Sequence, residues 1–368
     1  MGTLGGPASG AHRLRESGVA QMMTSSRIGE HPSALFTTGL PILQIALNPG
    51  VMTQHLEAIL NSGNGASGHR EVAHANLVAY KQGNRGLIRY DLSGESGSGE
   101  VMLGKLFPDP GRAARVEEIM RWLWEDVFSA NDFLTVPEPL GCVPELAMLL
   151  FRPLPGRPLD SALSEGGRGS KSLIQLCARW LAALHDSSTS LDRHFNLAVE
   201  AVNLEAWAAL IAHRYPDFAP ASQELFRALR EQSKGLRLDT NAPIHKDFHY
   251  QHVFVNGTLG VIDFDEIRWG DQNCDIAHFC AHLNLLSCRS RGGEEFEGLE
   301  ELFRASYAEY SGWSRDERFD FFFAYTCLKI AKQLVTTRGI RPRPEGAELK
   351  RQLAVVLDDG VAAILGRR

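Results

Sequence analysis

The chain has 368 residues, which is long enough for two lobes or domains and an additional tail. Hydrophobic residues make up 44% and charged residues 22% of the sequence, as in a soluble globular protein rather than a disordered or membrane chain. The formal net charge of −6 argues against a nucleic-acid-binding protein, because such proteins usually carry a basic patch.

Residues 1–40 are rich in Gly, Ser, Ala and Arg and lack periodicity, so we expect a disordered tail. We prefer a plain tail, or a misassigned start codon upstream of Met22, to an organelle presequence. No apolar core of a signal peptide and no run of about 18 apolar residues is present. The six cysteines lack Cys-x-x-Cys spacing, which indicates reduced thiols. We therefore expect a cytoplasmic protein without membrane or nucleic-acid partners.

Residues 41–150 show the pattern of a small lobe built from a sheet and helices. Asn48 followed by Pro49 is a helix-start signal, because Asn caps a helix and Pro suits its first turn. Alternating apolar residues and a Gly-rich tip at 82–86 predict a hairpin, and a further strand carries Lys105. The expected elements are a helix at 48–63, strands at 70–81, 87–92 and 100–107, and a helix at 110–124.

Residues 151–368 are expected to form a larger, mainly helical lobe. Apolar residues at helical spacing predict helices at 173–185, 204–215, 221–233, 279–286, 296–311, 315–337 and 345–365. One acidic run, at 294–301, has two interpretations. It is either a solvated helix face or an acidic rim for an amine-bearing substrate, and the sequence alone leaves both open.

The segment 244–277 contains most of the residues that suggest chemistry. Asn256-Gly257 separates two short apolar runs and predicts a two-residue hairpin turn. This turn would pair Val255 with Thr258 and His252 with Val261. Asp263 would then share a face with His252, roughly 7 Å away or less as a diagonal neighbour. A nitrogen ligand and a carboxylate would thus meet at one place, and Asp247 lies on the loop that enters the hairpin.

Three motifs in this segment resemble the catalytic region of the aminoglycoside phosphotransferase and choline kinase-like family, which has a protein kinase-like fold. The family pattern is H-x-D-x-x-x-x-N, then I-D-[FWY]-[DE], then G-D-x-x-x-D-[LI]-A. The sequence shows these motifs in order at 245–252, 262–265 and 270–277. One position departs from the pattern, because His252 stands where the family has Asn.

The resemblance implies a role for each carboxylate. Asp247 would be the catalytic residue that orients the substrate hydroxyl and accepts its proton, and Asp263 would hold Mg²⁺ against the nucleotide phosphates. His252 would be the second metal ligand, although Mg²⁺ prefers oxygen and imidazole suits softer metals. Gln251 offers an alternative oxygen, and Asp265 is either a further ligand or simply solvated.

The same resemblance implies a nucleotide site in the small lobe and at its border. Lys105 would bind phosphates and be held by an acidic residue of the next helix. We choose Glu117 over Glu118 as that residue, because Glu117 flanks the apolar face of the helix. Gly83 and Arg85 of the hairpin tip are further phosphate-binding candidates, and backbone groups of Arg152 and Leu154 are expected to face adenine. By the same alignment, Asp275 is expected to cap backbone amides or pair with His245.

These expectations combine into one prediction of fold and function. The fold would be α+β and protein kinase-like, with a disordered tail at 1–40, a small antiparallel-sheet lobe at 41–150 and a larger helical lobe at 151–368. The resemblance implies a kinase that uses ATP or GTP with Mg²⁺ to phosphorylate a hydroxyl of an aminoglycoside-, choline- or sugar-like small molecule. The alternatives are a non-catalytic nucleotide-binding scaffold, motivated by His252, and a kinase for a carrier- or protein-bound substrate.

Overall fold

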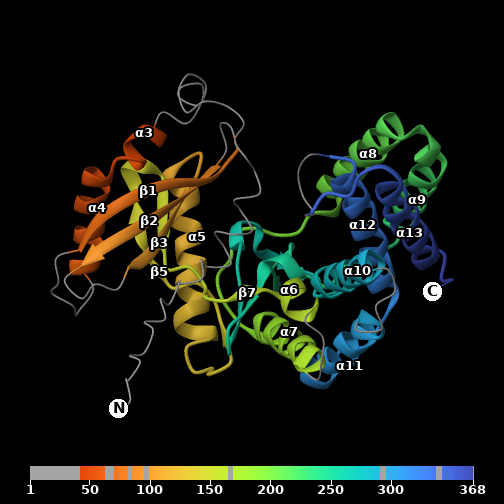
Figure 1. Cartoon of the computed structure of the whole chain (residues 1–368). Coiled ribbons are helices and arrows are strands. Elements are labelled where there is room, and N and C mark those ends of the chain that lie inside the picture. The colour runs from red at the N-terminus through yellow and green to blue at the C-terminus, as the bar shows by residue number, and fades with distance from the viewer. Residues whose placement is uncertain are drawn as a thin grey trace, which may run out of the picture.

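The structure is a computed structural model, and it describes residues 42–62, 70–81, 85–94, 99–164, 169–290, 296–336 and 342–367. The tail expected at 1–40 and the candidate Gly83 lie outside these residues. The described chain forms two lobes, one built around an antiparallel sheet and a larger one that is mainly helical (Figure 1). This is the α+β, protein kinase-like architecture that the motifs predict.

A five-stranded antiparallel sheet forms the centre of the small lobe, in the order β1-β2-β3-β6-β5. The first two strands form the predicted hairpin, with Lys81 opposite Arg85 at its tip. Lys105 lies in the middle strand of the sheet, between Leu87 and Leu149. The strands are β1 Arg70–Lys81, β2 Arg85–Gly94, β3 Glu100–Leu106, β5 Pro139–Val143 and β6 Met148–Phe151.

Helices cover both faces of this sheet (Figure 1). On one side lie α3 Leu43–Ala46 and α4 Pro49–Ser62, whose side chains share a core with the sheet. Asn48 caps α4 as expected, because its Oδ1 accepts the Val51 backbone N–H at 3.2 Å. On the other side, α5 Pro110–Trp122 continues as a π-helix, η1 Leu123–Val127. Its apolar face joins the core of the large lobe and so connects the two lobes.

Two small sheets in the large lobe position the segment that carries the motifs. The first has the order β4-β10-β9-β7, and the second pairs β11 with β8. Their strands are β4 Leu134–Thr135, β7 Arg157–Pro158, β8 Ala242–Ile244, β9 Val253–Val255, β10 Leu259–Val261 and β11 Arg268–Gly270. Short 3-10 turns lie at η2 Pro144–Leu146, η3 Pro216–Phe218, η4 Tyr250–His252 and η5 Phe264–Glu266.

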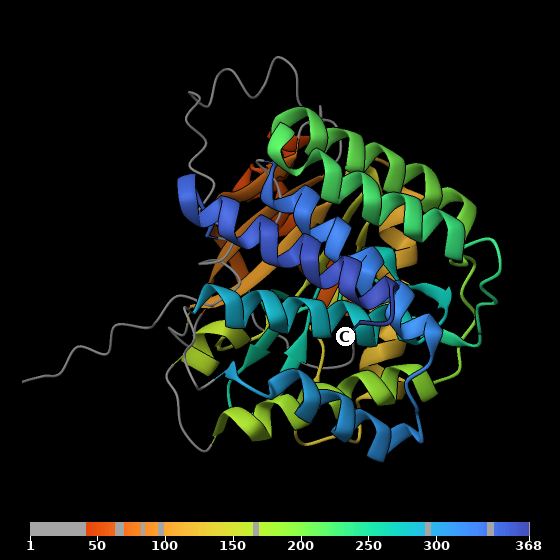
Figure 2. The ribbon, with the colours of Figure 1, turned by 90° about the vertical axis from the view of Figure 1, so that its right-hand side faces the viewer.

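The remaining helices pack as neighbouring pairs that run across the large lobe in similar directions (Figure 2). Helix α8 packs on α9, α12 on α13, and α7 on α11, while α10 packs on α12 in the centre. The helices are α6 Leu159–Ser164, α7 Gly169–Asp186, α8 Leu197–Arg214, α9 Ala219–Gln232, α10 Asn273–Arg289, α11 Leu299–Ser311, α12 Glu317–Leu334 and α13 Gly346–Ile364. Within the described residues, no helix is both long and apolar enough to span a membrane.

Candidate active site

The motif hairpin forms, but its register differs from the predicted one. Val255 pairs with Leu259 rather than with Thr258, and the Ile262 backbone N–H donates to the His252 carbonyl at 3.0 Å. The loop therefore has three residues, with Gly257 at a left-handed φ of 74°. The two-residue turn predicted from Asn-Gly is wrong, because a three-residue loop with one left-handed glycine also suits antiparallel strands.

Asp263 nevertheless faces His252 as the sequence predicted. A one-residue shift normally moves a side chain to the opposite face of a strand. Asp263, however, lies beyond the end of β10 and has a left-handed backbone, with φ 71° and ψ 66°. Its carboxylate oxygen Oδ2 lies 3.9 Å from Nε2 of His252. The left-handed backbone of Asp263, rather than strand pairing, accounts for this convergence.

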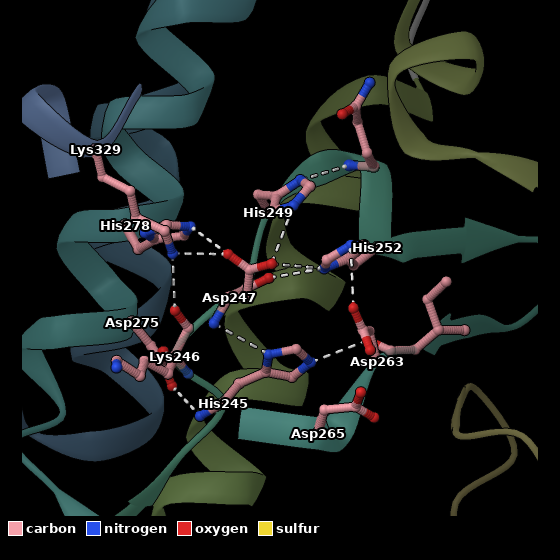
Figure 3. Close-up of polar contacts among 12 residues, drawn as sticks. His245, Lys246, Asp247, His249, His252, Asp263, Asp265, Asp275, His278 and Lys329 are labelled. Carbon is pink, nitrogen blue, oxygen red and sulfur yellow. Dashed lines mark hydrogen bonds and ion pairs between the residues drawn. The ribbon is translucent and has the colours of Figure 1, made fainter. Parts of the chain in front are cut away.

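Asp247 lies at the centre of a group of nitrogen atoms from three different elements (Figure 3). The Lys329 ammonium, on α12, donates to Oδ1 at 2.8 Å, and Nε2 of His278, on α10, lies 3.5 Å from the same oxygen. His249 and His252 lie 3.8 and 3.7 Å from Oδ2. These contacts orient both carboxylate oxygens.

The charge state of Asp247 follows from these neighbours. Burial alone would raise the pKa of Asp247, but the charge of the Lys329 ammonium and the nearby ring of His278 hold it well below its usual range. Burial in turn lowers the pKa of His278 to about 4, so that this ring is neutral at neutral pH. The site therefore presents an ionised carboxylate beside a charged lysine and the neutral imidazole of His278.

The hydrogen bonds of His252 indicate which ring nitrogen is free. Its Nδ1 lies 2.9 Å from the backbone carbonyl oxygen of Asp247, which can only accept a hydrogen bond. In the neutral form of the ring, we therefore assign the single proton to Nδ1. The unprotonated Nε2 then faces Asp263, and a backbone carbonyl that fixes the other nitrogen is the usual support for a histidine metal ligand.

A second group, Asp247, His249 and His252, also brings possible ligand atoms within 4.8 Å of one another. The Gln251 backbone N–H, however, donates to Nδ1 of His249 at 3.2 Å. Because Nδ1 accepts, the proton of this neutral ring must be on Nε2, the atom that faces Asp247. A protonated nitrogen cannot coordinate a metal, so the hydrogen bonds favour the pair His252 and Asp263.

Lys105 reaches this site from the small lobe. Its ammonium donates to Oδ1 of Asp263 at 2.8 Å and to Oδ1 of Asp265 at 2.6 Å. Burial alone would lower the pKa of Lys105, but these two carboxylates raise it. The same ammonium, together with the charge of Arg85, holds the pKa of Asp263 below its usual value against the effect of burial.

The predicted pairing of Lys105 with Glu117 is wrong for this structure. Glu117 accepts from Nε of Arg121 at 2.9 Å, one helical turn further along α5. In the described residues, Lys105 pairs instead with the carboxylates of Asp263 and Asp265, which belong to the motif segment 244–277. An i,i+4 arginine on the same helix offers Glu117 a closer partner than a lysine on the neighbouring strand.

The other candidates occupy the border of the site or lie away from it. Arg85 donates to Oδ2 of Asp265 at 3.0 Å, so the hairpin tip contacts the catalytic segment. Asp265 is therefore paired, not solvated. Arg152 pairs through its side chain with Glu100 and Glu138. Leu154 is buried in an apolar cluster formed by both lobes; its members are Val78, Leu87, Leu103, Leu154, Phe254 and Ile262.

Asp275 supports the loop that carries Asp247. Its carboxylate accepts the backbone N–H groups of His245 at 2.6 Å and of Lys246 at 2.7 Å, and Nε2 of His185 lies 3.2 Å away. The expected amide cap is therefore present. The His245 ring instead contacts the carbonyl oxygen of Ile262 at 3.0 Å, which connects the loop to the strand that precedes Asp263.

The sequence reasoning missed Lys329 and His278. His278 follows Asp275 by three residues, but the predicted helix began only at residue 279, whereas α10 begins at Asn273 and places both residues on one helix. Lys329 is 82 residues from Asp247, and nothing in its local sequence distinguishes it from a surface lysine. Only the packing of α12 on α10 brings it to the site.

Comparisons with solved structures agree with this fold. The choline kinase LicA from Streptococcus pneumoniae superposes with a TM-score of 0.54 and 14% identity, over 85% of this chain and 98% of that chain. A structure of LicA in complex with AMP superposes with a TM-score of 0.52 and 16% identity, over 85% of this chain and 99% of that chain. The amicoumacin kinase hAmiN, in complex with AMP-PNP, Ca²⁺ and Ami, superposes with a TM-score of 0.50 and 14% identity, over 78% of this chain and 88% of that chain. At these identities the similarity establishes the fold alone.

A comparison with curated protein sequences finds no match. A sequence model described as the phosphotransferase enzyme family matches residues 89–314, which is more than half of the chain and includes Lys105, Asp247 and Asp263. The chain therefore belongs to the phosphotransferase enzyme family.

Proposed function

We propose that this protein is a kinase that transfers the γ-phosphoryl group of ATP or GTP to a hydroxyl of a small molecule. One observation carries the proposal: four side chains form a continuous row from the small lobe to the catalytic loop. Lys105 contacts Asp263 at 2.8 Å, Asp263 lies 3.9 Å from His252, and His252 lies 3.7 Å from Asp247. Phosphoryl transfer needs groups that bind the nucleotide phosphates, the metal ion and the acceptor hydroxyl, and these side chains follow that order.

The residues in this row fit a divalent metal ion. Asp263 offers carboxylate oxygens, and His252 offers the unprotonated Nε2 beside them. A bound cation would neutralise charge on the phosphate oxygens during transfer. Because one of the two ligands is an imidazole, the site suits Mn²⁺ as well as Mg²⁺. Asp265 remains a further candidate ligand, and in this structure it contacts Lys105 and Arg85.

Each remaining residue has a defined part in the proposal. Asp247 orients the acceptor hydroxyl and accepts its proton as transfer proceeds, while Lys329 keeps the carboxylate ionised and in place. Lys105 binds phosphate oxygens, with Arg85 and Gly83 as further phosphate contacts. Backbone groups of Arg152 and Leu154 bind the base, next to the apolar cluster that includes Leu154.

A small molecule is the proposed acceptor for a structural reason. Asp263 is separated from Asp275, which caps the loop of Asp247, by little more than η5 and β11. This short connection has no room for the activation segment with which protein kinases position a protein substrate. The structural neighbours named above are likewise described as kinases of choline and of amicoumacin.

A non-catalytic nucleotide-binding scaffold is the second candidate, because His252 replaces the usual Asn. The free Nε2 of His252 argues for a metal ligand and thus against this candidate. The third candidate is a kinase that acts on a carrier- or protein-bound substrate.

Measurement of ADP release with Mg²⁺ and with Mn²⁺, across a panel of hydroxyl compounds, tests the proposal. We expect at least one acceptor to stimulate ADP release in the wild type and Asp247→Ala to abolish this stimulation while nucleotide still binds. Nucleotide binding without acceptor-stimulated release by the wild type, for any compound, would favour the scaffold instead.

A further inference from the structure

Lys329 of α12 lies on the side of Asp247 opposite to Asp263 (Figure 3), and a second lysine, Lys332, follows one turn later on the same helix. Lys329 contacts Asp247 at 2.8 Å, and Lys332 follows it by three residues on the same face of the helix. The charges of Lys329 and of Lys81, at the end of β1, both act on Lys332. Positive charge from both lobes therefore acts on Lys332, which lies one helical turn from the lysine that contacts Asp247.

Lys332 differs from Lys105 and Lys329, the other half-buried lysines of the site, because it forms no ion pair with a carboxylate in the described part of the chain. Its ammonium lies over the ring of Trp207, on α8, 5.4 Å from the ring centroid. Burial and the neighbouring lysines lower the pKa of Lys332, and only the charge of Asp247 opposes this. An ammonium in this environment would gain from an anionic ligand.

The nearby acidic residue on α8 does not provide such an anion. Glu200 is buried at 3% exposure and pairs with Lys246. It also accepts from the Tyr325 hydroxyl at 2.6 Å and from the Asn203 amide at 3.1 Å. Its carboxylate is therefore fully engaged, and it offers no negative surface to a cationic substrate.

The acidic run at 294–301 does not reverse this charge balance. Glu294 and Glu295 lie outside the described residues. Glu300 pairs with Arg304 on its own helix, α11, and that helix packs mainly against α7. The structure thus gives no support to the acidic rim that the sequence left open.

We propose that the acceptor carries a carboxylate or phosphate group beside its hydroxyl, and that Lys332 binds this anionic group while Asp247 receives the hydroxyl. Trp207 would form the wall next to the anion, and Lys329 would remain with Asp247. This inference rests on the proposed kinase function and specifies its substrate class: an anionic small molecule rather than a cationic one.

Anion binding to the nucleotide-loaded protein gives the first test. The wild type, saturated with AMP-PNP and Mg²⁺ so that the phosphate-binding groups are occupied, is titrated by calorimetry with inorganic phosphate and with malonate. Lys332→Gln should weaken binding of at least one anion by about tenfold or more, because a charged hydrogen bond is lost. Lys350→Gln is the matched control, since Lys350 pairs with Asp217 on the surface, and it should change affinity by less than about twofold.

Turnover with matched acceptors distinguishes the two anionic groups. Glycerate and glycerol 3-phosphate differ from glycerol only by a carboxylate or a phosphate, and choline provides the cationic comparison. We expect a larger kcat/KM for one of the two anionic compounds than for glycerol or choline, and loss of this preference in Lys332→Gln but not in Lys350→Gln.

The outcomes separate the inference from the function on which it rests. If the wild type binds AMP-PNP but neither anion, the inference of an anionic acceptor is wrong while the kinase proposal stands. The same holds if the wild type and Lys332→Gln bind the anions with equal affinity. Preferential phosphorylation of choline would also overturn it while supporting the kinase. Failure of the wild type to bind AMP-PNP would contradict the kinase and, with it, the inference.

Discussion

Nδ1 of His252 lies 2.9 Å from the backbone carbonyl oxygen of Asp247, so the proposed metal ligand is joined to the loop that carries Asp247. This contact assigns the ring proton to Nδ1 and leaves Nε2 directed at Asp263. The replacement of Asn by His therefore retains a possible ligand atom but changes it from oxygen to nitrogen. A change in metal preference is the expected consequence.

The variant His252→Asn tests this consequence. We expect the ratio of kcat/KM with Mn²⁺ to that with Mg²⁺ to fall by about tenfold, because an amide oxygen suits Mg²⁺ better than an imidazole does. The matched control is His249→Gln, since the accepting Nδ1 of His249 indicates that this ring is not a ligand. An unchanged ratio in His252→Asn would show that His252 does not coordinate the metal.

The partners of Lys105 lead to a second prediction. Asp265 contacts Lys105 at 2.6 Å and is 5% exposed, whereas Glu117 pairs with Arg121. Asp265→Asn should therefore weaken nucleotide binding by about tenfold, while Glu117→Gln should change it by less than about twofold. Equilibrium titration with AMP-PNP measures both. A larger loss in Glu117→Gln would mean that Lys105 exchanges partners when nucleotide binds.

A third prediction concerns Asp275, which is fully buried and caps the catalytic loop. Burial opposes its ionisation, but the hydrogen bond and charge of His185 hold the pKa of Asp275 below its usual value. Asp275→Asn should lower the free energy of unfolding at pH 7 by about 3 kcal/mol, because buried charged hydrogen bonds are lost. Chemical denaturation followed by circular dichroism measures this change.

The pH dependence of the same variant follows from the sign of the shift. A carboxylate whose pKa is lower in the folded state stabilises the protein above the unfolded pKa of about 3.9, and this contribution is lost as pH falls below it. The difference in stability between wild type and Asp275→Asn should therefore shrink as pH decreases below about 5. A difference that grows with acidification would contradict the proposed role.

The loop between the lobes provides a fourth prediction. Gly156 has a φ of 102°, and a Cβ atom at this position would lie 2.2 Å from the backbone oxygen of Val255. Gly156→Ala should destabilise the protein by about 3 kcal/mol, through backbone strain and this contact together. Gly298→Ala is the matched control: its φ is 72° and its Cβ would meet no atom within 4 Å. Gly298→Ala should lower the free energy of unfolding by only about 1 kcal/mol. Equal losses of stability in the two variants, measured by thermal unfolding, would refute the predicted clash with the Val255 backbone.

The sequence could predict the groups that lie close together along the chain. Asp247, His252 and Asp263 fall within one short segment, and their motifs specify a loop, a hairpin and a following turn. Lys105 could be placed on its strand because it lies in a short, nearly continuous apolar run that follows a polar, Gly-rich loop. The hairpin register could not be predicted, because two-residue and three-residue loops both suit an Asn-Gly pair.

Long-range packing explains what the sequence could not provide. Helical periodicity placed Glu117 on a suitable face of its helix, but it does not rank Lys105 against Arg121 as a partner. Lys329 and Lys332 lie on a helix whose existence was predicted, while their approach to Asp247 and Trp207 depends on how α12 packs against α10 and α8. Such contacts follow from tertiary structure rather than from local pattern.

The affinity for ATP in the presence of Mn²⁺, measured by calorimetry for the wild type and Asp263→Asn, tests the central claim most directly. If Lys105, Asp263 and His252 form one metal–nucleotide site, the wild type should bind and Asp263→Asn should bind at least about tenfold more weakly. Asp217→Asn, a control at an exposed surface pair, should match the wild type. No binding by the wild type, or equal affinity in Asp263→Asn, would contradict the account.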